Sequence, residues 1–417
     1  MQRIAIVGAG IAGLTAAWLL SRRYRVDLFE ASDYAGGHTH THQIEVGDRS
    51  YPVDSGFIVF NPDYYPLFCR LLEDLGVGTR ETEMSFSVRN DRTGLQYNAT
   101  DLPGLFCQRR NLVRPAFWRM LRDIARFYRE APALLQNPSS QAMTTGRFLE
   151  TRGYSEIFAT DHLIPMASAL WSAPPDRILA FPIQYMVRFF ANHRMLQMTN
   201  RPPWRTVEGG SQAYVRRLLD RLEATIHLAT PVRSIARSGH GLRVRTDTSE
   251  GDYDRVVLAC HSDQALAMLE QPSDDHRAVL GAMPYQRNDV VLHTDTSVLP
   301  ASRRGWAAWN ARIPRHDSQL CMVTYDMNIL QGHDAPLEFL VTLNQDTDID
   351  PARVLRRMTY HHPVYTTESV AAQGEFDRID GMQGLHFCGA YWGWGFHEDG
   401  VRSAARVAHR LGVAWDD

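Results

Sequence analysis

The sequence predicts an α/β protein built around a doubly wound, Rossmann-like parallel sheet. Three observations indicate this fold. An apolar strand, residues 3–7, runs directly into the turn GAGIAG and an apolar helix over residues 12–22. A second apolar strand, residues 26–30, ends in Glu30. The same alternation of strand and helix returns after Gly209-Gly210 and again at the C-terminal end.

Length and charge narrow the possible functions. A chain of 417 residues is long enough for two domains. The formal net charge of −3 argues against a nucleic-acid partner held by phosphate neutralisation. All 44 residues counted as lysine plus arginine are arginine, so the chain has no lysine. A Schiff base on a side-chain amine and the lysine of a phosphate-binding P-loop are therefore excluded.

Cysteine usage and hydropathy predict a soluble, cytoplasmic protein, with peripheral membrane contact left open. The five cysteines are scattered and form no CxxC pair, so neither a disulfide framework nor a zinc site is expected. The chain starts directly with strand-like residues, which leaves no room for a signal peptide. No apolar run reaches the ~18 residues of a membrane span.

A helical, aromatic and arginine-rich block is expected over about residues 62–201. Pro115 fits the first turn of an amphipathic helix in this block. The arginine and aromatic side chains over residues 117–128 could lie on an anionic bilayer. Solvated arginines over a packed helix are the alternative interpretation.

The α/β pattern resumes with a helix over residues 212–223, a hairpin of strands 230–237 and 241–247, and a buried strand over 254–260. A mixed region, residues 271–370, contains expected strands at 288–294, 319–327 and 338–344. The chain closes with a strand, a glycine-rich loop and a helix. The nucleotide domain is therefore expected to be discontinuous, with a second domain inserted twice.

The opening turn contains the residues that hold a dinucleotide. Gly8 permits the tight bend, Gly10 lets the backbone approach a pyrophosphate, and Gly13 lets the helix pack closely on the strand. The helix N-terminus supplies backbone amides and the positive end of its dipole. Glu30 is placed to bind the ribose hydroxyls. The predicted contacts are Gly8, Gly10, Ile11, Ala12, Gly13, Glu30 and Ala31.

The stretch that follows narrows the dinucleotide to FAD. EASDYAGGHTHT resembles the motif E-x(5)-GG-R-x-x-[ST] of flavoproteins of the flavin amine oxidase, protoporphyrinogen oxidase and phytoene desaturase superfamily. The contacts that this resemblance implies are Gly36, Gly37, His38 and Thr39. The arginine of the motif is His38 in this chain, which weakens the charge contact expected with the FAD pyrophosphate.

The resemblance continues in the same order along the chain. VDSGF resembles a segment that runs near the flavin, and VEGGS resembles the turn that opens the second part of the nucleotide domain. A valine of TPVRSIAR stands where such proteins contact the adenine, and the closing segment resembles one whose helix faces the flavin. The residues carried over are Asp54, Ser55, Gly56, Phe57, Val232, Ala259, Cys260, Gly389, Glu398, Asp399, Gly400 and Val401.

The same resemblance implies an FAD-binding domain of the GR2 type with an inserted α+β substrate domain. The FAD-binding domain is expected at residues 1–75, 202–270 and 371–417, and the substrate-binding domain at 76–201 and 271–370. Phrases such as DSGFIVFNPDYYP are similar to a bacterial branch of FAD-dependent oxidoreductases that accompany cyclopropane-fatty-acid-synthase-like methyltransferases. This similarity implies a hydrophobic or lipid substrate and a methyltransferase in the same pathway.

The reaction that the resemblance implies is hydride transfer from a C–H bond to flavin N5. Amine oxidases of the superfamily usually carry a lysine at N5, through water, and this chain has none. Desaturation of an unsaturated or methylated fatty acyl chain is therefore the leading hypothesis. Oxidation of a small amine is the first alternative. A flavin-binding isomerase or regulatory protein without net oxidation is the second.

Aromatic residues crowd the C-terminal loop expected beside the flavin. Tyr391, Trp392 and Trp394 are candidates for the wall of a substrate slot, and His397 is a candidate general base. Core packing of the aromatics, and a structural hydrogen bond from His397, are the alternatives. The histidines at positions 38, 40, 42, 361 and 362 lack a carboxylate or cysteine at suitable spacing, so no metal is expected.

Overall fold

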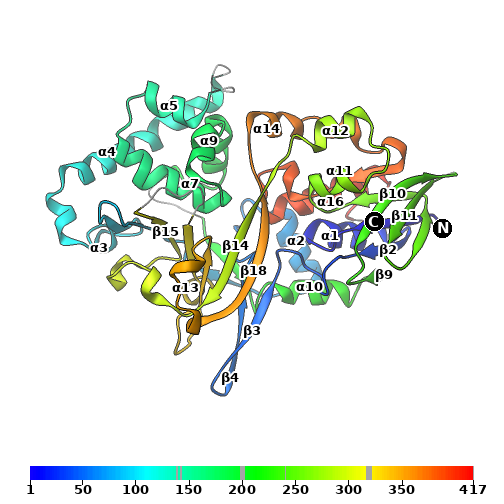
Figure 1. Cartoon of the computed structure of the whole chain (residues 1–417), viewed down its shortest axis with the longest axis horizontal. Coiled ribbons are helices and arrows are strands. Elements are labelled where there is room, and N and C mark those ends of the chain that lie inside the picture. The colour runs from blue at the N-terminus through cyan, green and yellow to red at the C-terminus, as the bar shows by residue number, and fades with distance from the viewer. Residues whose placement is uncertain (138–139, 141–142, 198–201, 240, 316–321, 417) are drawn as a thin grey trace.

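The computed structural model describes residues 1–137, 140, 143–197, 202–239, 241–315 and 322–416. At one end of the molecule lies a five-stranded parallel sheet in the order β19-β13-β1-β2-β9 (Figure 1). Its strands are β1 (Arg3–Val7), β2 (Arg25–Phe29), β9 (Ala224–His227), β13 (Arg255–Leu258) and β19 (Leu385–Phe387). Three stretches of chain far apart in sequence therefore build one sheet, and the predicted α/β class is confirmed. The domain boundaries themselves stay a prediction.

A seven-stranded sheet forms the middle of the molecule, in the order β18-β14-β17-β16-β15-β6-β7. All neighbours are antiparallel except β15 and β6. Its strands are β6 (Phe86–Asn90), β7 (Gln96–Asn98), β14 (Tyr285–His293), β15 (Trp309–Ile313), β16 (Met322–Asp326), β17 (Leu340–Leu343) and β18 (Val354–Pro363). The remaining strands are β3 (Thr41–Val46), β4 (Arg49–Asp54), β5 (Thr79–Thr82), β8 (Trp204–Val207), β10 (Val232–Ser238), β11 (Gly241–Thr246) and β12 (Glu250–Tyr253).

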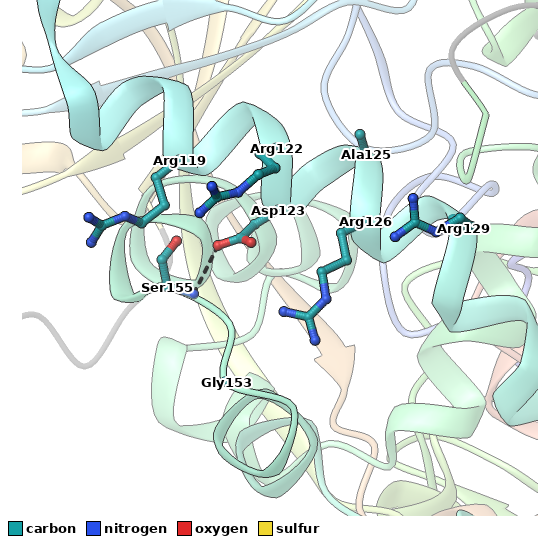
Figure 2. A pocket seen from close by; sticks show the side chains of 8 residues that line it. All are labelled: Arg119, Arg122, Asp123, Ala125, Arg126, Arg129, Gly153 and Ser155. Carbon is teal, nitrogen blue, oxygen red and sulfur yellow. Dashed lines mark hydrogen bonds between the residues drawn. The ribbon is translucent and has the colours of Figure 1, made fainter.

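A helical block stands at the end opposite the parallel sheet (Figure 1). Its helices are α3 (Leu102–Leu105), α4 (Pro115–Glu130), α5 (Thr145–Thr151), α6 (Glu156–Phe158), α7 (Ile164–Trp171), α8 (Pro175–Ala180) and α9 (Ile183–Asn192). Pro115 is the first residue of α4, as predicted, because a proline there removes no helical hydrogen bond. Phe117, Met120 and Phe127 of α4 are buried, while its arginines line the outside (Figure 2).

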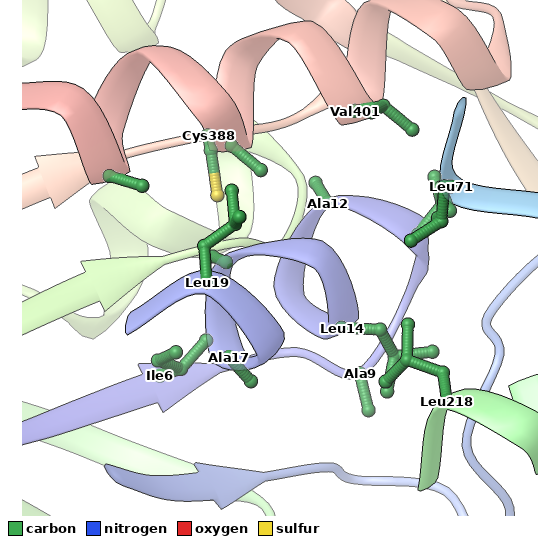
Figure 3. Close-up of a cluster of buried hydrophobic side chains, with 14 of the residues drawn as sticks. Ile6, Ala9, Ala12, Leu14, Ala17, Leu19, Leu71, Leu218, Cys388 and Val401 are labelled. Carbon is green, nitrogen blue, oxygen red and sulfur yellow. The ribbon is translucent and has the colours of Figure 1, made fainter. Parts of the chain in front are cut away.

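The helices around the parallel sheet enclose a separate core (Figure 3). Here α1 (Ile11–Leu20) packs against α16 (His397–Arg410), with α2 (Pro66–Leu75) and α10 (Gln212–Leu219) beside them. Every residue of α1 except Trp18 is buried, because α1 is covered on all sides. The other helices are α11 (Ser262–Met268), α12 (Asp274–Leu280), α13 (Met327–Gln331), α14 (Thr367–Gln373) and α15 (Phe376–Ile379).

Several sequence-based boundaries need correction. The first helix ends at Leu20 and the helix from Gln212 ends at Leu219, both earlier than predicted, because turns rather than helix follow them. The strand expected at 319–327 is β16, and residues 319–321 lie outside the described residues. No pattern in the sequence indicated β18, whose burial does not alternate along the strand. Among the described residues, no helix combines the length and the apolarity that crossing a membrane requires.

Candidate active site

A cavity of about 790 Å³ runs along the ends of the parallel strands and on to the seven-stranded sheet. The glycine turn after β1, Glu30 after β2, the turn after β13 and the C-terminal loop all contribute to its wall. In an open parallel sheet, loops at the carboxyl ends of the strands form the ligand-binding crevice. The predicted dinucleotide residues therefore meet at the position where this fold binds ligands.

The three glycines of the first turn differ in how much free space surrounds them. Gly8 has φ +104°, and its N–H donates to the carbonyl of Phe29 over 2.7 Å. A Cβ on Gly8 would lie 2.8 Å from the carbonyl oxygen of Ala259, and one on Gly13 would lie 1.8 Å from that of Gly8. A Cβ on Gly10 would meet nothing within 4 Å. Of these three glycines, Gly10 is therefore the one with free space beside it, and it lines the cavity.

A second glycine turn presses against the first. The N–H of Gly36 donates to the carbonyl of Ala9 over 2.8 Å, and Gly36 has φ +133°. Gly37 has φ +58°, and a Cβ there would lie 3.1 Å from Cα of Gly10. A side chain on Gly37 would press against the first turn, whereas one on Gly36 would clash with the carbonyl oxygen of Thr39 in its own turn. The contact between the two turns brings Gly10 of the first turn and Gly37 of the second into one wall of the cavity.

The carboxylate of Glu30 holds the loops around it in place. Its Oε2 accepts a hydrogen bond from the N–H of Ala9 over 2.7 Å, and its Oε1 accepts one from the N–H of Ser32 over 2.9 Å. Each carboxylate oxygen has a further lone pair for a ligand hydroxyl. Glu30 also lines the cavity, which keeps the predicted ribose contact open.

The predicted cofactor residues divide into two groups. Those that line the cavity are Gly8, Gly10, Ile11, Ala12, Glu30, Ala31, Gly36, Gly37, His38, Gly56, Phe57, Val232, Ala259, Cys260 and Gly389. Those outside the lining are Gly13, Thr39, Asp54, Ser55, Glu398, Asp399, Gly400 and Val401. Of the pocket-wall candidates, Tyr391, Trp394 and His397 line the cavity, whereas Trp392 lies behind it and packs on Phe376. Direct cofactor contact by any of these residues stays a prediction.

Some of the predicted residues outside the cavity lining hold its loops in place through hydrogen bonds. The Asp399 carboxylate accepts hydrogen bonds from the N–H groups of Trp394 and Phe396, over 3.0 and 3.1 Å, and so shapes the C-terminal loop. Burial raises the pKa of Asp399 to about 6. Glu398 accepts from the N–H of Phe68 over 2.9 Å at the start of α2.

Asp54 joins the β3–β4 hairpin to two other segments. It accepts hydrogen bonds from the N–H of Ser211 and from Nε2 of Gln331, each over 2.9 Å. Burial raises the pKa of Asp54 to about 7, although its hydrogen bonds favour the ionised form. Because Asp54 lies outside the cavity lining, its contacts make it a support for the site.

His397 sits at the N-terminus of α16 in a tight network. Its Nε2 lies 3.0 Å from both Thr39 Oγ1 and Tyr214 Oη, and those two oxygens are 2.6 Å apart. The imidazole stacks on Phe57 with 3.5 Å between ring centroids. Burial lowers the pKa of His397 well below its ordinary value, so the ring is neutral. The general-base role stays a prediction.

Histidines from three segments gather near the second glycine turn. His38 lies 5.3 Å from His362 and 6.4 Å from His261, measured between ring centroids. Burial lowers the pKa of His38 to about 4 and that of His362 to about 3. No group of three or more metal-ligating side chains forms a metal site within the part of the chain that the structure describes. The cluster was not visible in the sequence, because β18 brings His362 from far along the chain.

The far half of the cavity is aromatic and aliphatic, and most of its residues were not predicted from the sequence. They are Ile58, Val59, Met84, Leu170, Trp171, Phe189, Trp204, Trp309, Tyr325, Tyr365 and Phe396. Met84, Leu170, Trp171 and Phe189 belong to the aromatic helical block expected at residues 62–201, and the others come from elsewhere in the chain. Among the described residues of the lining, Glu30 is the one acidic side chain and Arg233 the one arginine.

The residues present fit a dinucleotide. Gly10 opens onto free space at the N-terminus of a buried helix, where backbone amides favour a phosphate. Nε2 of His38, Oη of Tyr391 and Nε1 of Trp394 are buried without a hydrogen-bond partner among the described residues. All three residues line the cavity. Buried polar atoms without a partner in the protein indicate a bound molecule that supplies the missing hydrogen bonds.

A match between the sequence and a protein-family model shows which family the chain belongs to. Residues 11–348 match the model of the flavin containing amine oxidoreductase family, which is most of the chain. The chain belongs to this family. The FAD cofactor predicted from the glycine turns is confirmed by the family match.

Three known proteins are similar to this chain in sequence or in fold. A Mycobacterium tuberculosis protein named as a putative flavin-containing monoamine oxidase, AofH, is 25% identical over 266 residues, which cover 61% of this chain and 56% of that protein. The chain thus spans about half the length of this curated relative. A 1-hydroxycarotenoid 3,4-desaturase of a Flavobacterium species is 35% identical over 98 residues, 23% of this chain and 18% of that protein. A CLA-producing fatty acid isomerase from P. acnes shares the fold with a TM-score of 0.69 at 16% identity, covering 99% of each chain.

Proposed function

We propose that this protein is an FAD-dependent oxidoreductase that dehydrogenates a hydrophobic, uncharged chain, namely an unsaturated or methylated fatty acyl group. The observation that carries the proposal is the composition of the cavity beyond the glycine turns. Its wall combines tryptophan, tyrosine, phenylalanine, leucine and methionine, and Glu30 is the one acidic residue of the described lining. The carboxylate of Glu30 already accepts hydrogen bonds from the N–H groups of Ala9 and Ser32.

The same composition argues against a charged amine. A buried ammonium needs a partner of opposite charge or several hydrogen-bond acceptors, because its desolvation is costly. The described far half of the cavity presents indole N–H and phenol groups rather than carboxylates. A hydrocarbon chain needs no such partner and gains free energy from contact with this surface. The names of two relatives, a carotenoid desaturase and a fatty acid isomerase, also support a long apolar substrate.

The roles of the chain's own residues follow from their positions. FAD, when bound, supplies the two-electron acceptor for a hydride from carbon. Phe189, Trp171 and Trp394 would position the apolar chain and exclude water from the reacting carbon. The neutral network of Thr39, Tyr214 and His397 would hold the loop that carries the reacting end of the cavity.

The test is anaerobic flavin reduction by two panels of compounds. We expect unsaturated and methyl-branched acyl substrates to bleach the oxidised flavin band, and primary amines to leave it unchanged. Reduction by amines alone would contradict the proposal and favour an amine oxidase. Products of unchanged mass with no lasting flavin reduction would contradict it and favour an isomerase.

A matched pair of variants isolates the role of polarity. Leu170 lines the far half of the cavity. Aspartate and asparagine branch at Cγ as leucine does and are equal to each other in size. We expect Leu170→Asp to raise the KM for an acyl substrate more than Leu170→Asn does, because the charge must be desolvated. Equal effects of the two variants would show that the substrate does not pack against this wall.

A further inference from the structure

We infer that residues 102–122 form a docking surface for an anionic phospholipid bilayer. This inference does not depend on which substrate the enzyme oxidises. It rests on an apolar cluster and a group of arginines that occupy the same end of the molecule. We call this surface the basic apolar patch. It consists of Leu102, Leu112, Val113, Trp118, Arg109, Arg110, Arg119 and Arg122.

Large apolar side chains are exposed there out of proportion to the rest of the chain. Among the described residues, seven large hydrophobic side chains are exposed, and four of them lie between positions 102 and 118. Leu102 is 70% exposed, Val113 81%, and Leu112 and Trp118 50% each. Clustered exposed apolar residues mark an interaction site, whereas scattered ones do not.

The apolar members adjoin one another. Trp118 Nε1 donates to the carbonyl of Leu112 over 2.9 Å, which fixes the indole beside the turn that carries Leu112 and Val113. The Trp118 ring also lies 5.7 Å from that of Phe106, whose N–H donates to the carbonyl of Leu102. Tryptophan with an anchored N–H and an exposed ring is typical of membrane interfaces.

The positive charge of the basic apolar patch favours an anionic partner. Residues 102–122 contain five arginines and no aspartate or glutamate, in a chain whose formal net charge is −3. Arg109, Arg119 and Arg122 form no ion pair with another described residue. Of the two acidic residues that flank this stretch, Asp101 accepts a hydrogen bond from the N–H of Gly104 over 2.7 Å. Asp123 is buried and accepts one from the N–H of Ser155 over 3.0 Å. A surface that is apolar and positively charged is complementary to a bilayer with anionic headgroups.

The helix geometry places the arginines and the tryptophan together. Positions 118, 122, 125 and 129 fall on one face of α4 because they are spaced by three or four residues.

A surface hollow of about 640 Å³ lies beside α4 and is lined by four of its arginines, Arg119, Arg122, Arg126 and Arg129 (Figure 2). Arg126 and Arg129 both pair with Glu130, with Nε of Arg126 3.1 Å and Nη2 of Arg129 3.7 Å from its Oε1. Arg119 and Arg122 are therefore the arginines of this hollow that are left to bind a phosphate. Helices α3 and α4 lie at the end of the molecule away from the parallel sheet (Figure 1).

The test is flotation of the full-length holoprotein with vesicles. We expect binding to phosphatidylcholine vesicles that contain phosphatidylglycerol, little binding to phosphatidylcholine alone, and release at high salt. An arginine near an anionic surface contributes about five-fold in affinity, so R119Q/R122Q should weaken binding about 30-fold. We expect L112S/V113S to weaken it about ten-fold.

Control variants keep the inference falsifiable. R216Q/R217Q removes two exposed arginines from α10, and L337S removes an exposed leucine from another surface. Both should float like the wild type, and all variants should keep the wild-type flavin content and unfolding temperature. The inference is wrong if the wild type ignores anionic vesicles, or if the patch variants bind as the wild type does. It is also wrong if light scattering shows a dimer that L112S/V113S dissociates, because the patch would then cover a second copy of the chain.

Discussion

A methyl group on Gly13 would lie 1.8 Å from the carbonyl oxygen of Gly8, whereas one on Gly10 would meet no protein atom within 4 Å. Both glycines belong to the same turn, yet they have different physical roles. Gly13 lets the helix approach the strand, and Gly10 leaves room at the cavity. The same added methyl group should therefore have different effects at the two positions.

Gly10→Ala and Gly13→Ala should separate cofactor binding from folding. Gly10 has φ −73° and ψ −177°, which alanine adopts without strain, so the apoprotein should keep its unfolding temperature. The added methyl group should lower FAD affinity about 10- to 100-fold by overpacking the cofactor contact. Gly13→Ala should destabilise the protein by at least about 3 kcal/mol. Thermal unfolding and flavin fluorescence titration of the apoprotein check both effects, and unchanged FAD affinity in Gly10→Ala would contradict the predicted contact.

Glu30→Ala should weaken FAD binding about 10- to 100-fold, because hydrogen bonds to a charged group contribute about 1.5–3 kcal/mol. Part of the loss will come from the loop, since Glu30 also accepts from Ala9 and Ser32. Glu30→Gln keeps one oxygen acceptor and should fall between the wild type and the alanine variant. Asp33→Asn, an exposed neighbour, is the matched control and should bind FAD as the wild type does. Equal dissociation constants for all four proteins would rule out the ribose contact.

His397→Asn tests the general-base role against a positioning role. The neutral imidazole already shares Nε2 with Thr39 and Tyr214, so we expect anaerobic flavin reduction to slow less than about ten-fold. Flavin retention and unfolding temperature should fall, because the stacking on Phe57 is lost. Tyr214→Phe removes one hydroxyl of the network and should cost about 1–2 kcal/mol of stability. A reduction rate lowered about 100-fold or more in His397→Asn, with intact flavin binding, would establish His397 as the base.

Stability should decrease as the pH falls from about 6.5 to about 4. Burial lowers the pKa of His293 to about 4, with Asp295 opposing the shift, so the unfolded chain takes up a proton first in this range. His293 alone should account for about 3 kcal/mol of this loss. The raised pKa values of Asp54, about 7, and Asp399, about 6, act in the opposite direction, because the folded state binds those protons first.

Denaturant unfolding at about pH 7 and about pH 4.5 measures the effect. His293→Gln should lose stability less steeply with acid than the wild type, because the glutamine does not titrate. His409→Gln, which changes an exposed histidine, should follow the wild type. A pH dependence of His293→Gln as steep as that of the wild type would show that His293 does not contribute to this loss of stability.

The fold class and the cofactor were predictable because both depend on local rules. The turn GAGIAG bends where only glycine fits, and its strand and helix follow from short apolar runs. Gly8, Gly10 and Glu30 were found for the same reason, since the spacing of a βαβ unit fixes where they meet. The boundaries of helices were predicted less well, because turn residues compete with helix at their ends.

The wall of the far half of the cavity was not predictable from the sequence. Met84 lies in the loop between β5 and β6, Leu170 in α7 and Trp309 in β15, and they face one cavity only after the seven-stranded sheet and the helical block pack together. His38 and His362 are likewise neighbours through β18 alone. No local pattern records such contacts, because burial against a distant segment is not a property of spacing along the chain.

The sequence by itself determined the glycine turns, the parallel α/β sheet and the absence of lysine, and that absence excludes lysine-dependent chemistry through composition alone. Only the tertiary structure decided that Glu30 is the one acidic side chain of the described cavity lining, that His397 is buried and neutral, and that four exposed apolar residues cluster beside arginines. The physical reason is that backbone conformation is set by neighbours in sequence, whereas dielectric environment, charge pairing and exposure are set by neighbours in space.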